Sequence, residues 1–256
     1  MLERKTKGIS YLVGDWPLDP NKSTLVFIHG AGGSGIFWRA QVEGLAQRAN
    51  TLAIDLPGHG KSDGGGKDKV EDYALTVAGF MKDIDIRNPI PCGLSMGGAI
   101  TQQLLIDYRD LAKAGVLIST GSRLKVAPVI FELIEKNYSD YVDMVCSVAA
   151  SEKTDPGLLA PFKEETALCK PEIVHGDFCA CDRFDVIDRL SAIDVPVLVI
   201  TAEDDKLTPP KYGAALEKGL KNASRVHIID AGHIVPVEKS DEINKAIMQF
   251  LDQTGL

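Results

Sequence analysis

Short apolar runs alternate with longer segments of helical spacing along most of this 256-residue chain. Unbroken runs rich in Val, Ile and Leu are typical of strands buried on both faces, and helices between such strands provide the crossovers of a parallel sheet. The chain is therefore predicted to be an α/β protein with a mostly parallel sheet flanked by helices. The expected strands are residues 23–30, 51–58, 88–95, 114–120, 195–205 and 225–233.

The alternation stops after the run at 114–120 and resumes only at residue 195. Helical patterns such as that of residues 127–150 fill the gap, with no convincing strand among them. Because the gap is too long for a simple connection, we expect a helical lid. The predicted organisation is a core of residues 1–121 and 191–256 with a lid insertion at 122–190.

Composition excludes several classes of function. The chain has 28 Lys and Arg against 36 Asp and Glu, a net charge of −8, and its basic residues are dispersed, which argues against a nucleic-acid surface. Five cysteines, an odd number, fit a reducing compartment. Cys179 and Cys181 form a C-x-C pair, but the spacing of a structural zinc site is absent. We therefore expect no metal and no disulfide framework.

The chain also lacks the sequence signals of secretion and membrane insertion. The N-terminal segment is charged from its third residue and has no apolar stretch with a small-residue cleavage site. No segment reaches the roughly 18 uninterrupted apolar residues of a membrane span. A cytoplasmic protein that is a monomer or homodimer, without a membrane partner, is the expectation.

Residues 91–100 read PCGLSMGGAI and place Ser95 between Gly93 and Gly97. A G-x-S-x-G pattern arises by chance in about one chain of this length in ten, so a plain Gly-Ser turn is the alternative. Here an apolar run precedes the serine and a helical pattern follows it, as a nucleophile elbow requires. Ser95 is therefore a candidate nucleophile, and the Met96 N–H at the helix N-terminus is a candidate oxyanion donor.

A serine nucleophile needs a base, and the chain has five histidines. His227 lies within a strand pattern, His175 in the predicted lid, and His29 and His59 each precede a glycine in a loop. His233 follows the last strand, at the carboxyl edge where α/β sheets carry their chemistry. It is the predicted base.

The base in turn needs a carboxylate to orient it. The run at 195–205 ends in Glu203, Asp204 and Asp205, any of which could also be a solvated loop residue. Asp205 is the first choice and Asp204 the second. The resulting chain order of serine, acid and histidine is the one expected for this architecture and differs from the two other familiar protease orders.

A second oxyanion donor is expected from HGAGGSG, residues 29–35, which follows the first long apolar run. Ala31 is the first candidate and Gly32 the second. The loop lacks the lysine of a phosphate-binding P-loop and the frame of a dinucleotide fingerprint, so no nucleotide cofactor is expected.

Together, FIHGAGGSG, DLPGHGKSD, CGLSMGGAI, VPVLVITAEDDKLTPP and the final DAGHIVPVE resemble the α/β-hydrolase superfamily, in the correct order and over nearly the whole chain. The resemblance implies an α/β-hydrolase fold: eight strands, mostly parallel, with the lid after strand six. It also implies a triad of Ser95, Asp205 and His233, with Ala31 and Met96 as oxyanion donors.

Within the superfamily the motifs are similar to carboxylesterases and 3-oxoadipate enol-lactonases. Leu94 stands where carbon–carbon bond hydrolases often carry Asn, which disfavours that activity, and a serine nucleophile excludes haloalkane dehalogenases. The lid segment at 123–150 does not resemble the enol-lactonase lid.

The expected function is cleavage of a carboxylic ester on small or medium apolar substrates, without a cofactor. An enol-lactonase, a thioesterase, a carbon–carbon bond hydrolase and a non-catalytic ligand-binding protein remain alternatives. Expected contacts with a small-molecule ester or lactone are Gly32, Trp38, Val129 and Leu133. Apolar lid residues, with Val126, Ile130 and Ile134 as further examples, could line an acyl pocket. Packing of lid helices onto the sheet is the alternative for each of these apolar lid residues.

Overall fold

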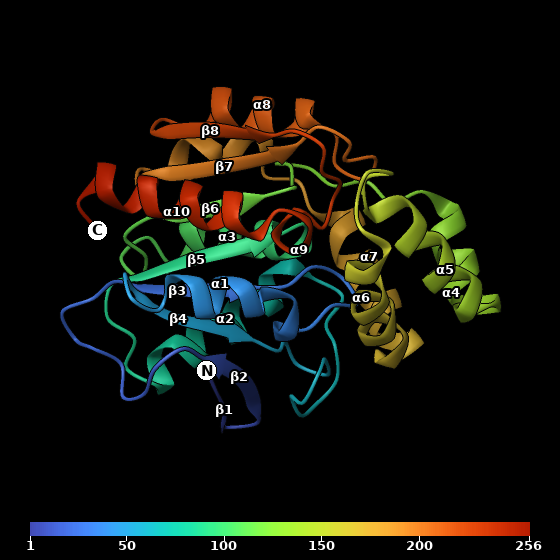
Figure 1. Cartoon of the computed structure of the whole chain (residues 1–256), viewed down its shortest axis with the longest axis horizontal. Helices are drawn as coiled ribbons and strands as arrows, with labels where there is room; N and C mark the ends of the chain where they lie inside the picture. Colours follow the sequence, from blue (N-terminus) through green and yellow to red (C-terminus); the bar gives the residue numbers. More distant parts are fainter.

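A computed structural model describes all residues, 1–256, and contains one eight-stranded sheet in the order β1-β2-β4-β3-β5-β6-β7-β8 (Figure 1). Strands β3 to β8 are parallel to one another, and β2 pairs antiparallel with β1 and β4. The strands are β1 (Leu2–Thr6), β2 (Ile9–Val13), β3 (Thr24–Ile28), β4 (Asn50–Ile54), β5 (Pro89–Leu94), β6 (Gly115–Ile118), β7 (Val197–Ala202) and β8 (Ala223–Ile228). The predicted fold, a mostly parallel sheet of eight strands, is confirmed.

The N-terminal hairpin of β1 and β2 has no counterpart among the apolar runs of the sequence. Residues 2–5 are exposed, because β1 is the edge strand. Its charged side chains are typical of an edge that must not pair with another chain. The turn that follows has Lys7 at φ 48° and Gly8 at φ 86°, the positive angles that favour a tight hairpin.

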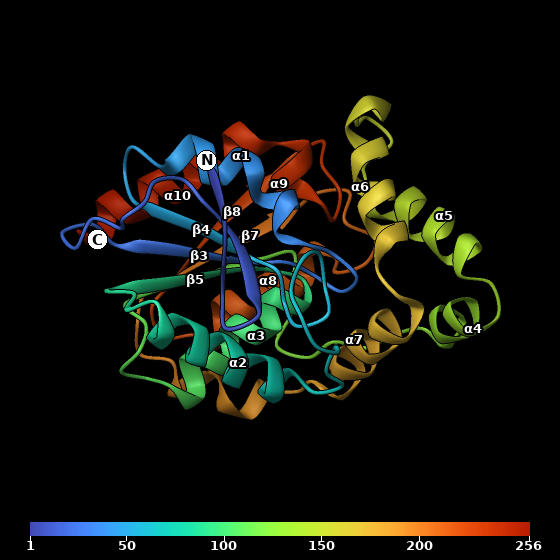
Figure 2. The ribbon, with the colours of Figure 1, turned by 90° about the horizontal axis from the view of Figure 1, so that it is seen from below.

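Helices cover both faces of the sheet (Figure 2). One face carries α1 (Arg39–Leu45), the short α9 (Val235–Glu238) and α10 (Ser240–Thr254), and the other carries α2 (Val70–Asp83), α3 (Met96–Asp107) and α8 (Pro210–Gly219). Each side of the sheet has its own apolar core, of 24 and 33 buried residues respectively. The helix expected at 37–49 is shorter than predicted, because residues 35–38 form a 3-10 turn, η1 (Gly35–Trp38), before α1 begins.

Residues 122–190 hold four helices at the end of the sheet where β5 and β6 finish, on the right of Figure 1. They are α4 (Pro128–Lys136), α5 (Tyr138–Ala149), α6 (Pro156–Leu168) and α7 (Pro171–Arg183), followed by a 3-10 turn, η2 (Ile187–Ala192). The helical pattern at 127–150 is broken at Asn137, whose side chain accepts a hydrogen bond from the Asp140 N–H as the N-cap of α5. A third apolar core of 12 buried residues holds these helices together.

Strand β5 and helix α3 meet without room for side chains between them. A Cβ atom on Gly93 would collide with the Gly97 carbonyl, and one on Gly97 would collide with the Ile28 carbonyl at the end of β3. Between these glycines Ser95 has φ 55° and ψ −115°, a strained conformation for a residue with a side chain. The glycines therefore allow the turn that raises Ser95 above the sheet.

This packing predicts that Gly97→Ala destabilises the protein by about 3 kcal/mol or more, because the added methyl can be accommodated only by moving backbone. Gly79→Ala is the matched control, since Gly79 lies in α2 with nothing within 4 Å of an added Cβ. That substitution should stabilise by about 0.5–1 kcal/mol. Chemical denaturation followed by circular dichroism measures both, and equal stabilities for the two variants would contradict the packing argument.

Candidate active site

Ser95 is held in place by hydrogen bonds to residues at the end of the neighbouring strand β6. Its N–H donates to the Ile118 carbonyl of β6 over 3.0 Å, and its carbonyl accepts a 2.8 Å hydrogen bond from the Thr120 hydroxyl. Both contacts leave the Ser95 side chain free. Helix α3 begins at the next residue, so its N-terminal amides surround the serine.

Asp205 and His233 form a hydrogen-bonded pair at the ends of β7 and β8. The His233 Nδ1 lies 3.1 and 3.0 Å from the two carboxylate oxygens of Asp205. Thr208 donates to the same carboxylate from its N–H over 2.8 Å and from its hydroxyl over 2.8 Å. With its carboxylate held on both oxygens, Asp205 can fix the Nδ1–H tautomer of His233.

The other two acids of this loop have different partners. Asp204 accepts a 2.5 Å hydrogen bond from the Ser151 hydroxyl, and Glu203 accepts one from the Asp230 N–H over 3.2 Å. The structure therefore brings Asp205, the first choice among the three acids, to His233. Thr208 was not singled out in the sequence, although it stands three residues after the acid.

Burial and the neighbouring groups shift the pKa of Asp205 in opposite directions. Removal from water alone would raise the pKa of the Asp205 carboxyl, but the facing His233 and the hydrogen bonds from His233 and Thr208 outweigh it. The pKa of Asp205 is lowered as a result. The acid thus stays ionised at neutral pH, as an orienting carboxylate must.

His233 is the one histidine that lines the cavity above Ser95. Both ring nitrogens of His29 bond backbone, the Gly30 carbonyl and the Leu56 N–H. His175 pairs with a glutamate on the surface, His227 with a strand threonine, and His59 with a buried aspartate. Their partners explain why these four do not compete as bases.

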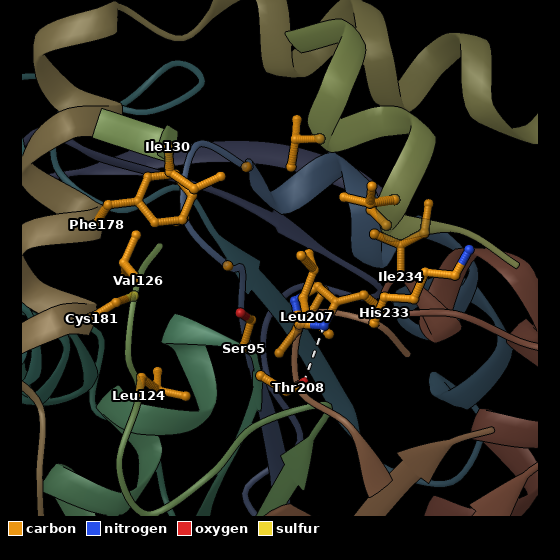
Figure 3. Close-up of a pocket in the computed structure, with 18 of the residues that line it drawn as sticks. Ser95, Leu124, Val126, Ile130, Phe178, Cys181, Leu207, Thr208, His233 and Ile234 are labelled. Atoms are coloured by element: carbon orange, nitrogen blue, oxygen red, sulfur yellow. Dashed lines mark hydrogen bonds between the residues drawn. The ribbon is translucent and has the colours of Figure 1, made fainter. Parts of the chain in front are cut away.

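The cavity has a volume of about 270 Å³ and lies between the strand ends and the helical segment. Ser95 and His233 both project into it (Figure 3). Seventeen of its 24 lining residues are hydrophobic, and the charged ones are the two lysines Lys125 and Lys206. Such a cavity suits an apolar ligand group held next to a few polar atoms.

The backbone near Ser95 offers two free donors. The Ala31 N–H has no hydrogen-bond partner, and Ala31 lines the cavity. Met96 is the first residue of α3, so its N–H has no partner within the helix. Gly30 brings the Ala31 loop close, because a Cβ there would lie 3.2 Å from the Ser95 Cβ.

The four expected substrate contacts are not among the residues that line the cavity. Trp38 is fully buried and stacks on Phe27 with a ring separation of 5.0 Å, because η1 turns it toward the sheet. Val129 is 52% exposed, and Leu133 packs against the core of the helical segment. The Gly32 N–H is engaged by a carboxylate from α7.

Other residues of the helical segment face the cavity. As expected from the sequence, Val126 and Ile130 are among them, Val126 from the segment before α4. On α4, Ile130 lines the cavity while its neighbour Val129 is exposed, because successive residues of a helix lie about 100° apart. From α5 come Tyr141, Met144, Val145 and Val148, whose spacing of three and four residues defines one helix face. That spacing was visible in the sequence, but which face it lines was not.

No group of three or more His, Cys, Asp or Glu is arranged to hold a metal ion. All five cysteines are free thiols, and Cys181 of the C-x-C pair lines the cavity, where burial raises the pKa of its thiol. None of the helices combines the length and apolar character that a membrane span requires.

The sequence matches the model of the alpha/beta hydrolase family over residues 25–246. The chain belongs to the alpha/beta hydrolase family. The resemblance noted in the sequence motifs is thereby confirmed, and with it the prediction of a hydrolase-family enzyme.

Known proteins resemble this family member over nearly its full length. The solved structure of a thermophilic esterase is 32% identical, with a TM-score of 0.84, and the match covers 99% of this chain and 98% of that one. An enol-lactonase from Burkholderia xenovorans is 24% identical, with a TM-score of 0.88 and coverage of 98% and 100%. A protein of Mycobacterium tuberculosis named as a candidate non-heme bromoperoxidase is 28% identical over 88% of this chain and 92% of its own length.

The lowered pKa of Asp205 predicts a pH-dependent effect of Asp205→Asn on stability. Because the folded carboxyl ionises more readily than an unfolded one, its stabilisation is fully present above the unfolded pKa of about 3.9 and is lost as pH falls through the lowered folded value. Urea midpoints should therefore be lower for the variant at neutral pH and converge in acid. A constant difference at every pH would contradict this linkage.

Proposed function

We propose that this protein is a serine hydrolase that cleaves carboxylic esters through an acyl-enzyme, with Ser95, His233 and Asp205 as its catalytic triad. The observation that carries the proposal is that His233, hydrogen-bonded to Asp205, lines the same apolar cavity as Ser95. The likeness to a thermophilic esterase at 32% identity supports the ester as the substrate class.

In the proposed reaction the His233 Nε2 takes the proton of the Ser95 hydroxyl as the oxygen attacks the ester carbonyl carbon. The carbonyl oxygen becomes an oxyanion and accepts hydrogen bonds from the Ala31 and Met96 N–H groups. Protonated His233 then gives its proton to the leaving alcohol. A water activated by His233 hydrolyses the acyl-enzyme in the second step and regenerates Ser95.

Residues 122–190 act in this proposal as the lid that encloses the acyl group. Leu124, Val126, Ile130 and Phe178 line the cavity from this segment (Figure 3). Their apolar side chains favour small or medium apolar acyl groups over charged ones. Catalysis by these groups calls for no cofactor.

Ser95→Ala should abolish labelling by a fluorophosphonate probe and lower kcat on p-nitrophenyl butyrate by about 10⁴-fold or more, because no other group can form the acyl-enzyme. Gel fluorescence of the labelled protein and the initial rate measure the two effects.

Ser119→Ala provides the matched control. Ser119 directly follows the neighbouring strand β6 and has a positive φ of 44° and a buried hydroxyl without a partner. It should keep both labelling and activity. Labelling that survives in Ser95→Ala would overturn the assignment of the nucleophile.

Activity should rise along p-nitrophenyl acetate, butyrate and hexanoate, by up to about fourfold in kcat/KM per added CH₂, since each buried methylene contributes about 0.8 kcal/mol. The rise should stop once the cavity is full. Val148→Phe, which places a ring in the cavity from α5, should move the optimum to a shorter chain.

Ser147→Phe adds the same ring at an exposed position of the same helix and should leave the optimum unchanged. A preference for an enol-lactone or a thioester over every p-nitrophenyl ester, with probe labelling intact, would keep the triad and replace the ester as substrate. Labelling without turnover of any of these compounds would contradict the ester proposal.

A further inference from the structure

Asp177 is a fully buried carboxylate on α7 that contacts two loops and helix α2 of the sheet-bearing core. Its Oδ2 accepts hydrogen bonds from the Gly32 N–H and the His59 Nε2–H, each over 2.8 Å, and its Oδ1 accepts one from the Tyr73 hydroxyl over 2.5 Å. A buried charge with all of its acceptors engaged is costly to assemble and adds little stability by itself. A gain in stability therefore does not account for these contacts.

His59 supplies the opposite charge. Its burial alone would lower the pKa of its imidazole, but Asp177 raises that pKa well above the ordinary value. The second ring nitrogen, Nδ1, donates a hydrogen bond to the Pro57 carbonyl over 3.1 Å. The His29 ring lies tilted against His59, with ring centres 4.8 Å apart. The pKa of His29 is lowered, first by burial and then by the charge of His59. The positive charge thus stays on His59, beside the carboxylate.

The contact with Gly32 falls on the loop that carries the candidate oxyanion donor. Residues 30–33 form a turn, closed by the Gly33 N–H donating to the Gly30 carbonyl over 3.1 Å. Gly32 has φ +65°, the left-handed value that a type II turn requires at its third position. Ala31 occupies the second position, with its own N–H unpartnered beside the cavity.

Type I and type II turns differ by a flip of their central peptide, here the one between Ala31 and Gly32. The Asp177 carboxylate receives the N–H of that peptide. A flip would replace this N–H with the Ala31 carbonyl oxygen and set it against a buried negative charge, which is strongly unfavourable. Asp177 therefore selects one orientation of the loop.

We infer that Asp177 is a positioning residue of this enzyme: by holding the Ala31–Gly32 peptide it fixes the turn of residues 30–33, whose preceding peptide carries the Ala31 N–H beside the cavity for the developing oxyanion. The inference rests on the proposed serine hydrolysis. It also gives α7 a role beyond covering the cavity, because the helix delivers the charge that shapes the oxyanion loop.

Asp177→Asn, which keeps the shape and removes the charge, tests this role. It should lower kcat on p-nitrophenyl butyrate by about 10²-fold, toward the loss seen when one oxyanion donor is removed. Affinity for phenylboronic acid, which forms a tetrahedral adduct like the intermediate, should fall by a similar factor, while KM changes by less than about threefold.

Tyr73→Phe is the matched control, since it removes another hydrogen bond to the same carboxylate without touching Gly32. It should lower the melting temperature but leave kcat and boronate affinity within about threefold of wild type. If Asp177→Asn behaves like Tyr73→Phe, with lower stability and unchanged kcat and boronate affinity, the carboxylate is merely structural and the inference fails.

Amide hydrogen exchange of the wild-type protein gives a test that does not depend on a variant folding. The Gly32 amide, bonded to a fully buried carboxylate, should exchange slowly, and rapid exchange would overturn the inference. Failure of the proposed function itself is recognised separately, by fluorophosphonate labelling that persists in Ser95→Ala.

Discussion

The close approach of β5, α3 and β3 is the constraint on which the site depends. It exists because Gly93 and Gly97 leave no side chain between the strand, the helix and the Ile28 carbonyl. Ser95 takes its strained backbone angles from that approach, and the N-terminus of α3 is brought against the same point. The position of the proposed nucleophile thus depends first on backbone packing around the two glycines.

Polar contacts, and not apolar packing alone, fix the helical segment to this frame. Asp177 ties α7 to the Gly32 loop, while the Ala149 carbonyl at the end of α5 accepts hydrogen bonds from the N–H groups of His233 and Ile234 over 2.6 and 3.1 Å. The helices that cover the cavity are therefore hydrogen-bonded both to the candidate oxyanion loop and to the candidate base.

Five of the six strands that could be predicted, β3 to β7, are buried on both faces, where an unbroken apolar run is the direct consequence of burial. The edge strand β1 escaped prediction because its side chains are solvated and charged. Cavity residues were harder to predict. Trp38 is buried against Phe27 of the sheet, and Val129 is exposed. A position one or two residues further along a helix lies on a different face, so small errors in the expected helix bounds change which side chains reach the cavity.

The sequence alone determined six of the strands and the serine at the turn, because local spacing of apolar runs and glycines encodes them. Its motifs determined the family, and only the family resemblance implied eight strands. Only the tertiary structure decided that Asp205 and not Asp204 meets His233, and that Asp177 reaches the Ala31 loop. Asp205 and His233 are 28 positions apart in the sequence, and Asp177 lies 118 positions from His59 and 145 from Gly32. No local pattern encodes such pairs, since their geometry depends on how α7 and the strand ends pack in space.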